Sequence, residues 1–189
     1  MRGVSAQLNR IASPPGVSLQ AGILYNSPRM SFLRFLMFLV LVVWLGGLIF
    51  LAFVVAPTAF APGFLPSRHL AGSVVGRSLD WLHWMGIVTG IVFLTVSMIY
   101  NRVTLGSARA AGARHLLIAL MLLLTLISQF AISPKLHAIR NEVGVIDKLP
   151  LDHPLRAEFN RLHAWSEDFE KGVLLLGLVA LYLTAKALH

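Results

Sequence analysis

The sequence contains no cysteine among its 189 residues, and few of its residues are charged. The absence of cysteine excludes disulfides, thiolate metal sites and cysteine nucleophiles. Only 13% of the residues are charged, about half the share of an ordinary soluble domain, whereas 57% are hydrophobic. The chain also lacks H-x-x-x-H and H-E-x-x-H pairs, a phosphate-binding glycine loop and a nucleophile elbow. We therefore expect a membrane protein that is not an enzyme.

Four apolar runs predict membrane-crossing helices. Residues 35–56, 81–100 and 116–134 have 22, 20 and 19 residues, close to the roughly 20 that a bilayer requires. The fourth run, residues 172–185, has 14 residues. At 1.5 Å per residue it covers about 21 Å of a hydrocarbon core about 30 Å thick. We therefore expect its helix to begin upstream, within FNRLHAWSEDFEKG at residues 159–172.

The predicted fold class is all-α. We expect one four-transmembrane-helix antiparallel bundle over residues 31–188, in which the second and fourth helices extend beyond the bilayer. Residues 1–29 are polar and predict a disordered tail. An alternative is that Met30 is the true start, because MSFLRFLMFLVLVVWLGG is typical of the beginning of a membrane protein.

Local signals predict the helix ends. Three prolines, at 57, 62 and 66, predict a connection after the first helix, and Ser67 is a suitable N-cap for a helix over about residues 68–101. The third helix meets Pro134 near its end and is followed by a mixed-charge connection over residues 135–150. Asp152-His153-Pro154 predicts the start of a fourth helix that runs to about Ala187.

The net charge of +8 indicates contact with anionic lipid headgroups. The basic residues are scattered between apolar runs, so we expect lipid headgroups and no nucleic acid as partners. We expect a multi-pass protein of the cell (inner) membrane. Lysine and arginine are equally numerous on the two predicted faces; the acid-free connection over residues 101–114, with its three arginines, favours cytoplasmic termini.

Polar residues gather where the second and fourth helices begin. At 100° per residue, one face of the fourth helix carries Phe159, His163, Ser166 and Glu170. The opposite face carries Arg161, Trp165 and Asp168.

On the second helix Asp80 precedes His83 by three residues, near enough for the carboxylate to orient the imidazole. We expect these two residues and the first face of the fourth helix to line a polar mouth that binds or moves a small molecule or ion. The alternative is that helix ends at the interface collect such residues to bond headgroups and backbone ends.

Histidines at the same end of the bundle support two further interpretations. Haem or copper would be ligated by residues among His69, His83, His137 and His163, although our first expectation is that the chain holds no metal or cofactor. A membrane scaffold or assembly factor is the third possibility.

Small residues predict close helix packing. Gly72, Gly76, Gly86 and Gly90 recur on one face of the second helix, and Gly46 and Gly47 follow Trp44 in the first. Gln129, inside the third helix, is expected to hydrogen-bond between helices. A homo-oligomer is compatible with these surfaces.

Three stretches together resemble the bacterial branch of the transmembrane protein 205-like family. They are WLGGLIFLAFVVAPTAF, RHLAGSVVGRSLDWLHWMG and FNRLHAWS, and the resemblance covers roughly residues 32–185. Its most specific element is F-x-x-x-H-x-x-S at Phe159, His163 and Ser166. The resemblance implies a small four-helix membrane protein and supplies no catalytic residues or cofactor. Glu170 stands where asparagine is expected in the eukaryotic relatives.

W-x-G-G followed by an apolar run to a proline also resembles the copper-resistance D family and related haem-binding four-helix proteins. Those proteins usually carry a histidine in the helix ahead of the tryptophan. SFLRFLMFLVLVV, the segment before Trp44, contains none.

Overall fold

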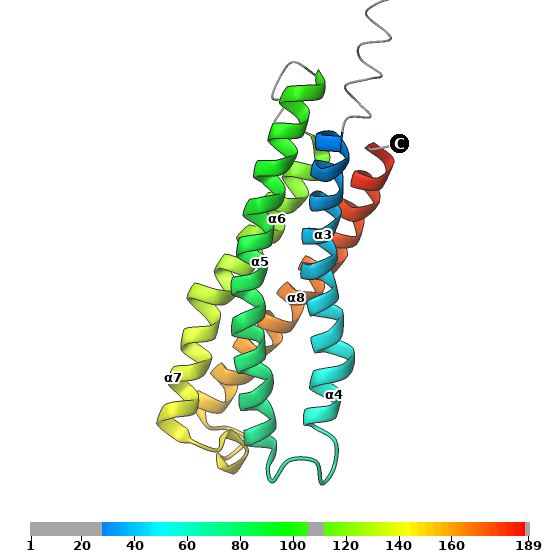
Figure 1. Cartoon of the computed structure of the whole chain (residues 1–189). Coiled ribbons are helices and arrows are strands. Elements are labelled where there is room, and N and C mark those ends of the chain that lie inside the picture. The colour runs from blue at the N-terminus through cyan, green and yellow to red at the C-terminus, as the bar shows by residue number, and fades with distance from the viewer. Residues whose placement is uncertain (1–27, 106–111, 188–189) are drawn as a thin grey trace, which may run out of the picture.

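The computed structural model describes residues 28–105 and 112–187, and it is helical throughout apart from short connections (Figure 1). No strand occurs in these two ranges, so the all-α prediction is confirmed. The expected tail lies outside the described residues, except that Pro28 and Arg29 already belong to the first helix.

Residues 28–105 and 112–187 form four helical rods. The first consists of α3 (Pro28–Phe50), the π-helical turn η1 (Leu51–Val55) and α4 (Ala56–Ala59). The second is α5 (Arg68–Leu105), and the third joins α6 (Ala113–Ile127), the π-helical turn η2 (Ser128–Ile132) and α7 (Ser133–Val143). After the 3₁₀ turn η3 (Ile146–Lys148), the fourth rod is α8 (Pro154–Ala187).

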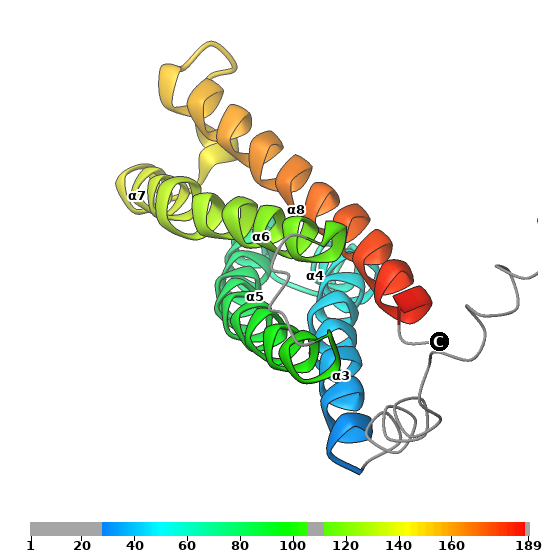
Figure 2. The same ribbon diagram turned by 90° about the horizontal axis from the view of Figure 1, so that it is seen from above.

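Consecutive rods are antiparallel, so α4, α7 and the start of α8 share the end of the bundle away from the termini (Figure 1). The closest packing joins α3 to α5 and α6 to α8. Figure 2 shows α7 and the first turns of α8 diverging from α3 and α5.

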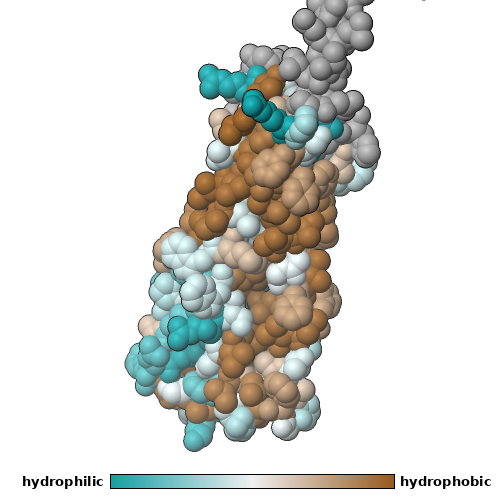
Figure 3. Space-filling view, in the orientation of Figure 1, coloured by the Kyte–Doolittle hydropathy of each residue, from teal (hydrophilic) through white to brown (hydrophobic). Residues whose placement is uncertain are grey.

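Three helices are long and apolar enough to cross a membrane: Pro28–Ala59, Arg68–Thr104 and Ala113–Val143. Figure 3 shows hydrophobic surface along the middle of the bundle and hydrophilic surface at both ends, with the larger hydrophilic area at the α7 end. Helix α8 has 34 residues, but Glu170, Lys171 and Lys186 flank its apolar run. A crossing by α8 therefore stays a prediction.

Two prolines lie inside rods where the sequence predicted breaks. A π-helical turn lies just before each proline. The N–H of Ala56, one residue before Pro57, donates to Leu51 O, and the N–H of Ser133, one residue before Pro134, donates to Ser128 O. The prolines thus occupy the first turn of the restarted α-helix, where a missing N–H costs least. The first rod therefore passes Pro57, and residues 135–143 are helical, so the prediction of a connection over all of residues 135–150 is wrong.

Local capping explains the other ends. The N–H of Leu70 donates to Ser67 Oγ over 3.1 Å, which confirms the predicted cap of α5. At the start of α8, Leu155 N–H donates to His153 Nδ1 over 3.3 Å, so the histidine is the capping residue in Asp152-His153-Pro154.

Two buried apolar clusters hold the bundle. The larger spans α3, α5, α6 and α8, and includes Met37, Trp44, Phe93, Met121 and Val173. The smaller lies at the α7 end and consists of Ile132, Leu136, Ile139, Ile146 and Leu162. Along the third rod and α8, polar residues separate the two clusters, and the site described below lies at this level.

The glycines of α5 serve two different neighbours. A Cβ at Gly86 would lie 2.5 Å from Trp44 Nε1, and one at Gly90 would lie 2.6 Å from Leu122, so both allow close helix packing as predicted. Gly47 similarly makes room for Leu82 and Met85.

The other predicted packing glycines differ. A Cβ at Gly72 or Gly76 would meet the guanidinium of Arg140, a charged group, whereas Gly86 and Gly90 face Trp44 and Leu122. No described atom lies within 4 Å of a Cβ built at Gly46, so close packing at that position is wrong within this chain.

Candidate binding pocket

A cavity of about 560 Å³ opens at the end of the bundle away from the termini. Its size lies in the usual range of small-molecule pockets. One wall is apolar and comes from the first rod, with Leu48, Leu51, Ala52, Ala56 and Phe60. The polar wall comes from α5, α7 and α8. The pocket is therefore amphipathic.

Between the two apolar clusters lies a polar layer that consists of His83, Gln129 and Glu170. In this layer His83 connects three helices. Its Nε2 lies 2.7 Å from Glu170 Oε1 on α8, and its Nδ1 lies 2.9 Å from Gln129 Oε1 in η2. The imidazole donates from Nδ1 to the amide oxygen, and one proton lies between Nε2 and the carboxyl oxygen. His83 is 1% exposed, whereas Glu170 is 19% exposed and also lines the cavity. Glu170 thus joins the buried histidine to the pocket.

Gln129 belongs to the π-helical turn η2, and its side chain meets His83 across the helix interface. The predicted interhelical hydrogen bond of Gln129 is present, and its partner is the site histidine.

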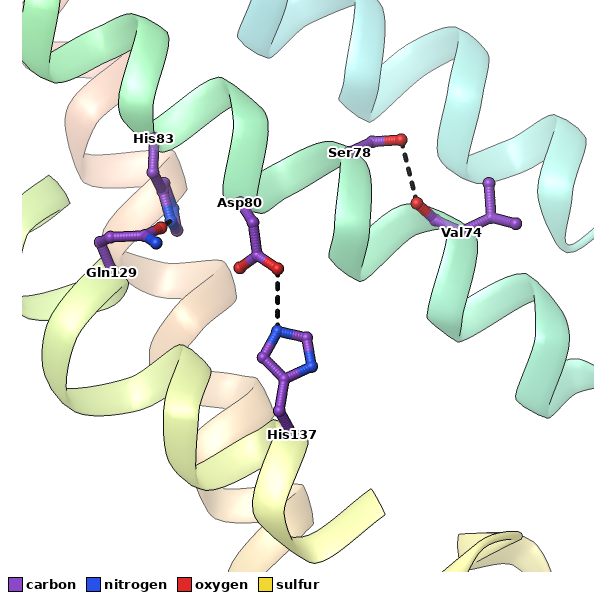
Figure 4. A network of polar contacts seen from close by, with 6 residues as sticks. All are labelled: Val74, Ser78, Asp80, His83, Gln129 and His137. Atoms are coloured by element: carbon purple, nitrogen blue, oxygen red, sulfur yellow. Dashed lines mark hydrogen bonds and ion pairs between the residues drawn. The ribbon is translucent and has the colours of Figure 1, made fainter. Parts of the chain in front are cut away.

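Asp80 has a different partner from the one predicted. Its Oδ2 accepts from His137 Nε2 on α7 over 2.8 Å, as Figure 4 shows, while Gln129 lies beside His83 in the same view. The predicted pairing of Asp80 with His83 is therefore wrong. His83 and Asp80 both lie on α5, but α8 and η2 face the histidine, and α7 faces the carboxylate.

Three further predicted residues line the pocket from α8. Ser166 is buried, Phe159 is half-buried and His163 is exposed. The rings of Phe159 and His163 stack with centroids 5.9 Å apart, and His163 Nε2 lies 3.2 Å from Glu167 Oε1. Trp165 lies outside with Arg161 over its ring, which agrees with the predicted division of the two faces.

Arg140 is the pocket residue that sequence reasoning missed. Its guanidinium lies 5.1 Å from the centroid of the Phe159 ring and occupies the space beside Gly72 and Gly76. No hydrogen bond or salt bridge to a described residue accompanies this stacking. The glycine spacing on α5 was the available signal, although glycines serve a packed helix equally well.

The four histidines of the metal interpretation do not converge on one point. His69, His137 and His163 line the pocket, while both ring nitrogens of His83 are hydrogen-bonded to Gln129 and Glu170. Within residues 28–105 and 112–187, no group of three or more His, Asp or Glu side chains has an arrangement that would hold a metal ion.

A second polar cluster, which the sequence pattern did not predict, joins α5 to α6 at the opposite end of the bundle from the pocket. Arg114 Nη2 donates to Asn101 Oδ1 over 2.7 Å, and Ser97 Oγ lies 3.0 Å from His115 Nε2. All four side chains are buried. Arg114 and His115 were expected in or beside a basic connection, but they lie in the first turn of α6 and pack against α5.

One family model matches the chain, over residues 39–144, and it is described as a domain of unknown function (DUF4149). The matched range contains most of the first rod, α5 and the third rod, and it ends before α8. No curated protein and no solved structure matches the chain.

Proposed function

The chain belongs to the DUF4149 family, and from its geometry we propose that it is a non-enzymatic membrane protein that binds a small amphipathic molecule or ion in the pocket. The observation that carries this proposal is the contact between Glu170, which lines the cavity, and His83, which is buried in the polar layer beneath it. Polar and ionisable residues inside a membrane bundle are costly and are typically retained for function.

The pocket composition supports binding more than reaction. Its apolar wall on the first rod suits a hydrocarbon part, and the wall formed by α5, α7 and α8 suits a polar part. Among the described residues that line or adjoin the pocket, three histidines are paired with acids: His83 with Glu170, His137 with Asp80, and His163 with Glu167. Such pairs orient a ligand without supplying a nucleophile.

The membrane arrangement is part of the proposal. We place α8 as a fourth span, because its 34 residues extend over about 51 Å and pack against α6. We place the protein in the inner membrane with both termini on the cytoplasmic side. The pocket then opens toward the opposite side of the membrane. The resemblance to the transmembrane protein 205-like family likewise stays a proposal, and it agrees with a small four-helix membrane protein.

Photolabelling with a neutral alkyl alcohol that carries a diazirine tests the proposal. The protein is reconstituted in lipid nanodiscs, labelled, and mapped by peptide mass spectrometry. We expect saturable labelling at pocket residues such as Phe60, Leu136 and Phe159, reduced by an excess of unlabelled alcohol. Labelling that is distributed along the lipid-facing surface and does not saturate would exclude the pocket as a binding site.

A further inference from the structure

The polar wall of the pocket contains one half-buried arginine that makes no hydrogen bond or salt bridge within the described residues. This is Arg140 on α7, whose guanidinium stacks on Phe159 and fills the space left by two glycines of α5. A Cβ at Gly76 would lie 2.8 Å from Nη1, and one at Gly72 would lie 3.4 Å from Nη2. The glycines thus admit the guanidinium to the pocket wall, and its flat face is supported by an aromatic ring.

Three of the four acids that line the pocket are engaged with other side chains. Asp80, which interacts electrostatically with Arg140, accepts a hydrogen bond from His137. Glu170 is bonded to His83, and Glu167 lies within ion-pair distance of His163 and Lys171. Asp147 also lines the pocket, but its side chain is exposed and no salt bridge joins it to Arg140 within the described part of the chain.

Two other arginines at this end have partners of their own, whereas Arg68, which also lines the pocket, is exposed. Arg156 Nη1 donates to Leu149 O over 2.6 Å, which ties the start of α8 to the preceding connection. Arg161 lies over the ring of Trp165 on the outer face of α8. Arg140 differs because its stacking partner, Phe159, belongs to the pocket wall, so its N–H groups are available to a ligand.

We propose that the pocket is selective for acidic amphiphiles, molecules with one carboxylate or phosphate group that binds Arg140 and an apolar chain that lies against the first rod. This inference rests on the proposed function, because it names the ligand class of the same pocket. A guanidinium donates two parallel hydrogen bonds to a carboxylate or phosphate, and such charge-assisted pairs are stronger than neutral ones. Leu48, Leu51, Ala52 and Phe60 supply the apolar surface for the chain.

Competition against the neutral photoprobe tests this selectivity. The competitors share a ten-carbon chain and differ in the head group: decanoate, decyl phosphate, decanol and decyltrimethylammonium. We expect at least one of the two anions to displace the probe at about tenfold lower concentration than decanol or the cation. Tenfold corresponds to about 1.4 kcal/mol, the lower range for a hydrogen bond to a charged group. Comparing the two anions distinguishes a carboxylate from a phosphate ligand.

Two substitutions assign the selectivity to Arg140. Arg140→Gln should remove the tenfold preference and leave probe labelling by the neutral alcohol in place, whereas Arg140→Lys should retain part of it. The matched control is Arg161→Gln, which removes a cation from the outer face of α8 and should leave the preference unchanged. If Arg140→Gln does not fold, the wild-type preference and its reduction in Arg140→Lys decide the question.

The possible failures are distinguishable. Equal displacement by all four competitors, with saturable probe labelling intact, would overturn the acidic ligand class and leave the pocket as a binding site. A preference for anions that persists unchanged in Arg140→Gln would also overturn the role of this residue. Absence of saturable labelling in the wild-type protein would overturn both proposals.

Discussion

His83 Nε2 lies 2.7 Å from Glu170 Oε1, and this contact joins α5 to α8 between residues that are 87 positions apart in the sequence. The histidine is almost completely buried and does not itself line the pocket. Its partner, the Glu170 carboxylate, does. The pair therefore joins α5 to α8 between the two apolar clusters, and its carboxylate lines the cavity.

Removing the carboxylate should destabilise the bundle. For Glu170→Ala we expect the free energy of unfolding to fall by about 2–4 kcal/mol, because His83 would remain buried without its partner. The measurement is reversible unfolding in mixed detergent micelles, followed by circular dichroism.

The matched control for Glu170→Ala is Glu167→Ala, one turn closer to the opening on the same helix. Glu167 and His163 are both about half exposed, so their pair should contribute within about 0.5 kcal/mol. Equal losses in the two variants would show that the His83–Glu170 contact contributes nothing beyond the removal of a glutamate from α8.

Glycine-to-alanine substitutions distinguish glycines that are needed for close helix packing from glycines that have space for a side chain. Gly86→Ala places a methyl group 2.5 Å from the buried Trp44 ring, and we expect a loss of about 1–3 kcal/mol in the free energy of unfolding. Gly46→Ala meets no described atom within 4 Å, so we expect no loss and a gain of up to about 1 kcal/mol from helix propensity. The same unfolding assay measures both, and a larger loss at Gly46 would contradict the packing described for α3 and α5.

Much of the helical framework was predictable because its signals are local. Ser67 caps α5 and His153 caps α8, and both caps depend on neighbours within three residues. The angular position of Phe159, Ser166 and Glu170 on α8 follows from the regular geometry of one helix. Such information is present in the sequence.

Contacts between helices were harder to predict. The spacing of Asp80 and His83 suggested a pair, yet each bonds to a residue on another helix, since a three-residue spacing does not say which helix lies opposite. Gly72 and Gly76 matched a helix-packing stripe and in fact admit Arg140. Pro134 indicated a break, but a π-helical turn lets α7 continue past it.

The membrane topology is testable with single cysteines because the chain has none of its own. An impermeant maleimide should label Ala61→Cys and Leu151→Cys from one side, since both lie in exposed connections at the pocket end. It should label Arg102→Cys and Lys186→Cys from the other side, the cytoplasmic one in our proposal. Labelling of Lys186→Cys from the same side as Leu151→Cys would exclude α8 as a fourth span.

The most direct test of the binding pocket is to fill it. Val75 on α5 lines the cavity, whereas Val88 on the same helix is 59% exposed on the outer surface. The measurement is saturable labelling by the neutral photoprobe in nanodiscs for Val75→Trp and Val88→Trp, each first shown to unfold like the wild-type protein. We expect Val75→Trp to lose at least about nine-tenths of the saturable labelling, because an indole occupies a large part of a small-molecule cavity, and Val88→Trp to keep it. Undiminished labelling in a folded Val75→Trp protein would contradict ligand binding in this pocket.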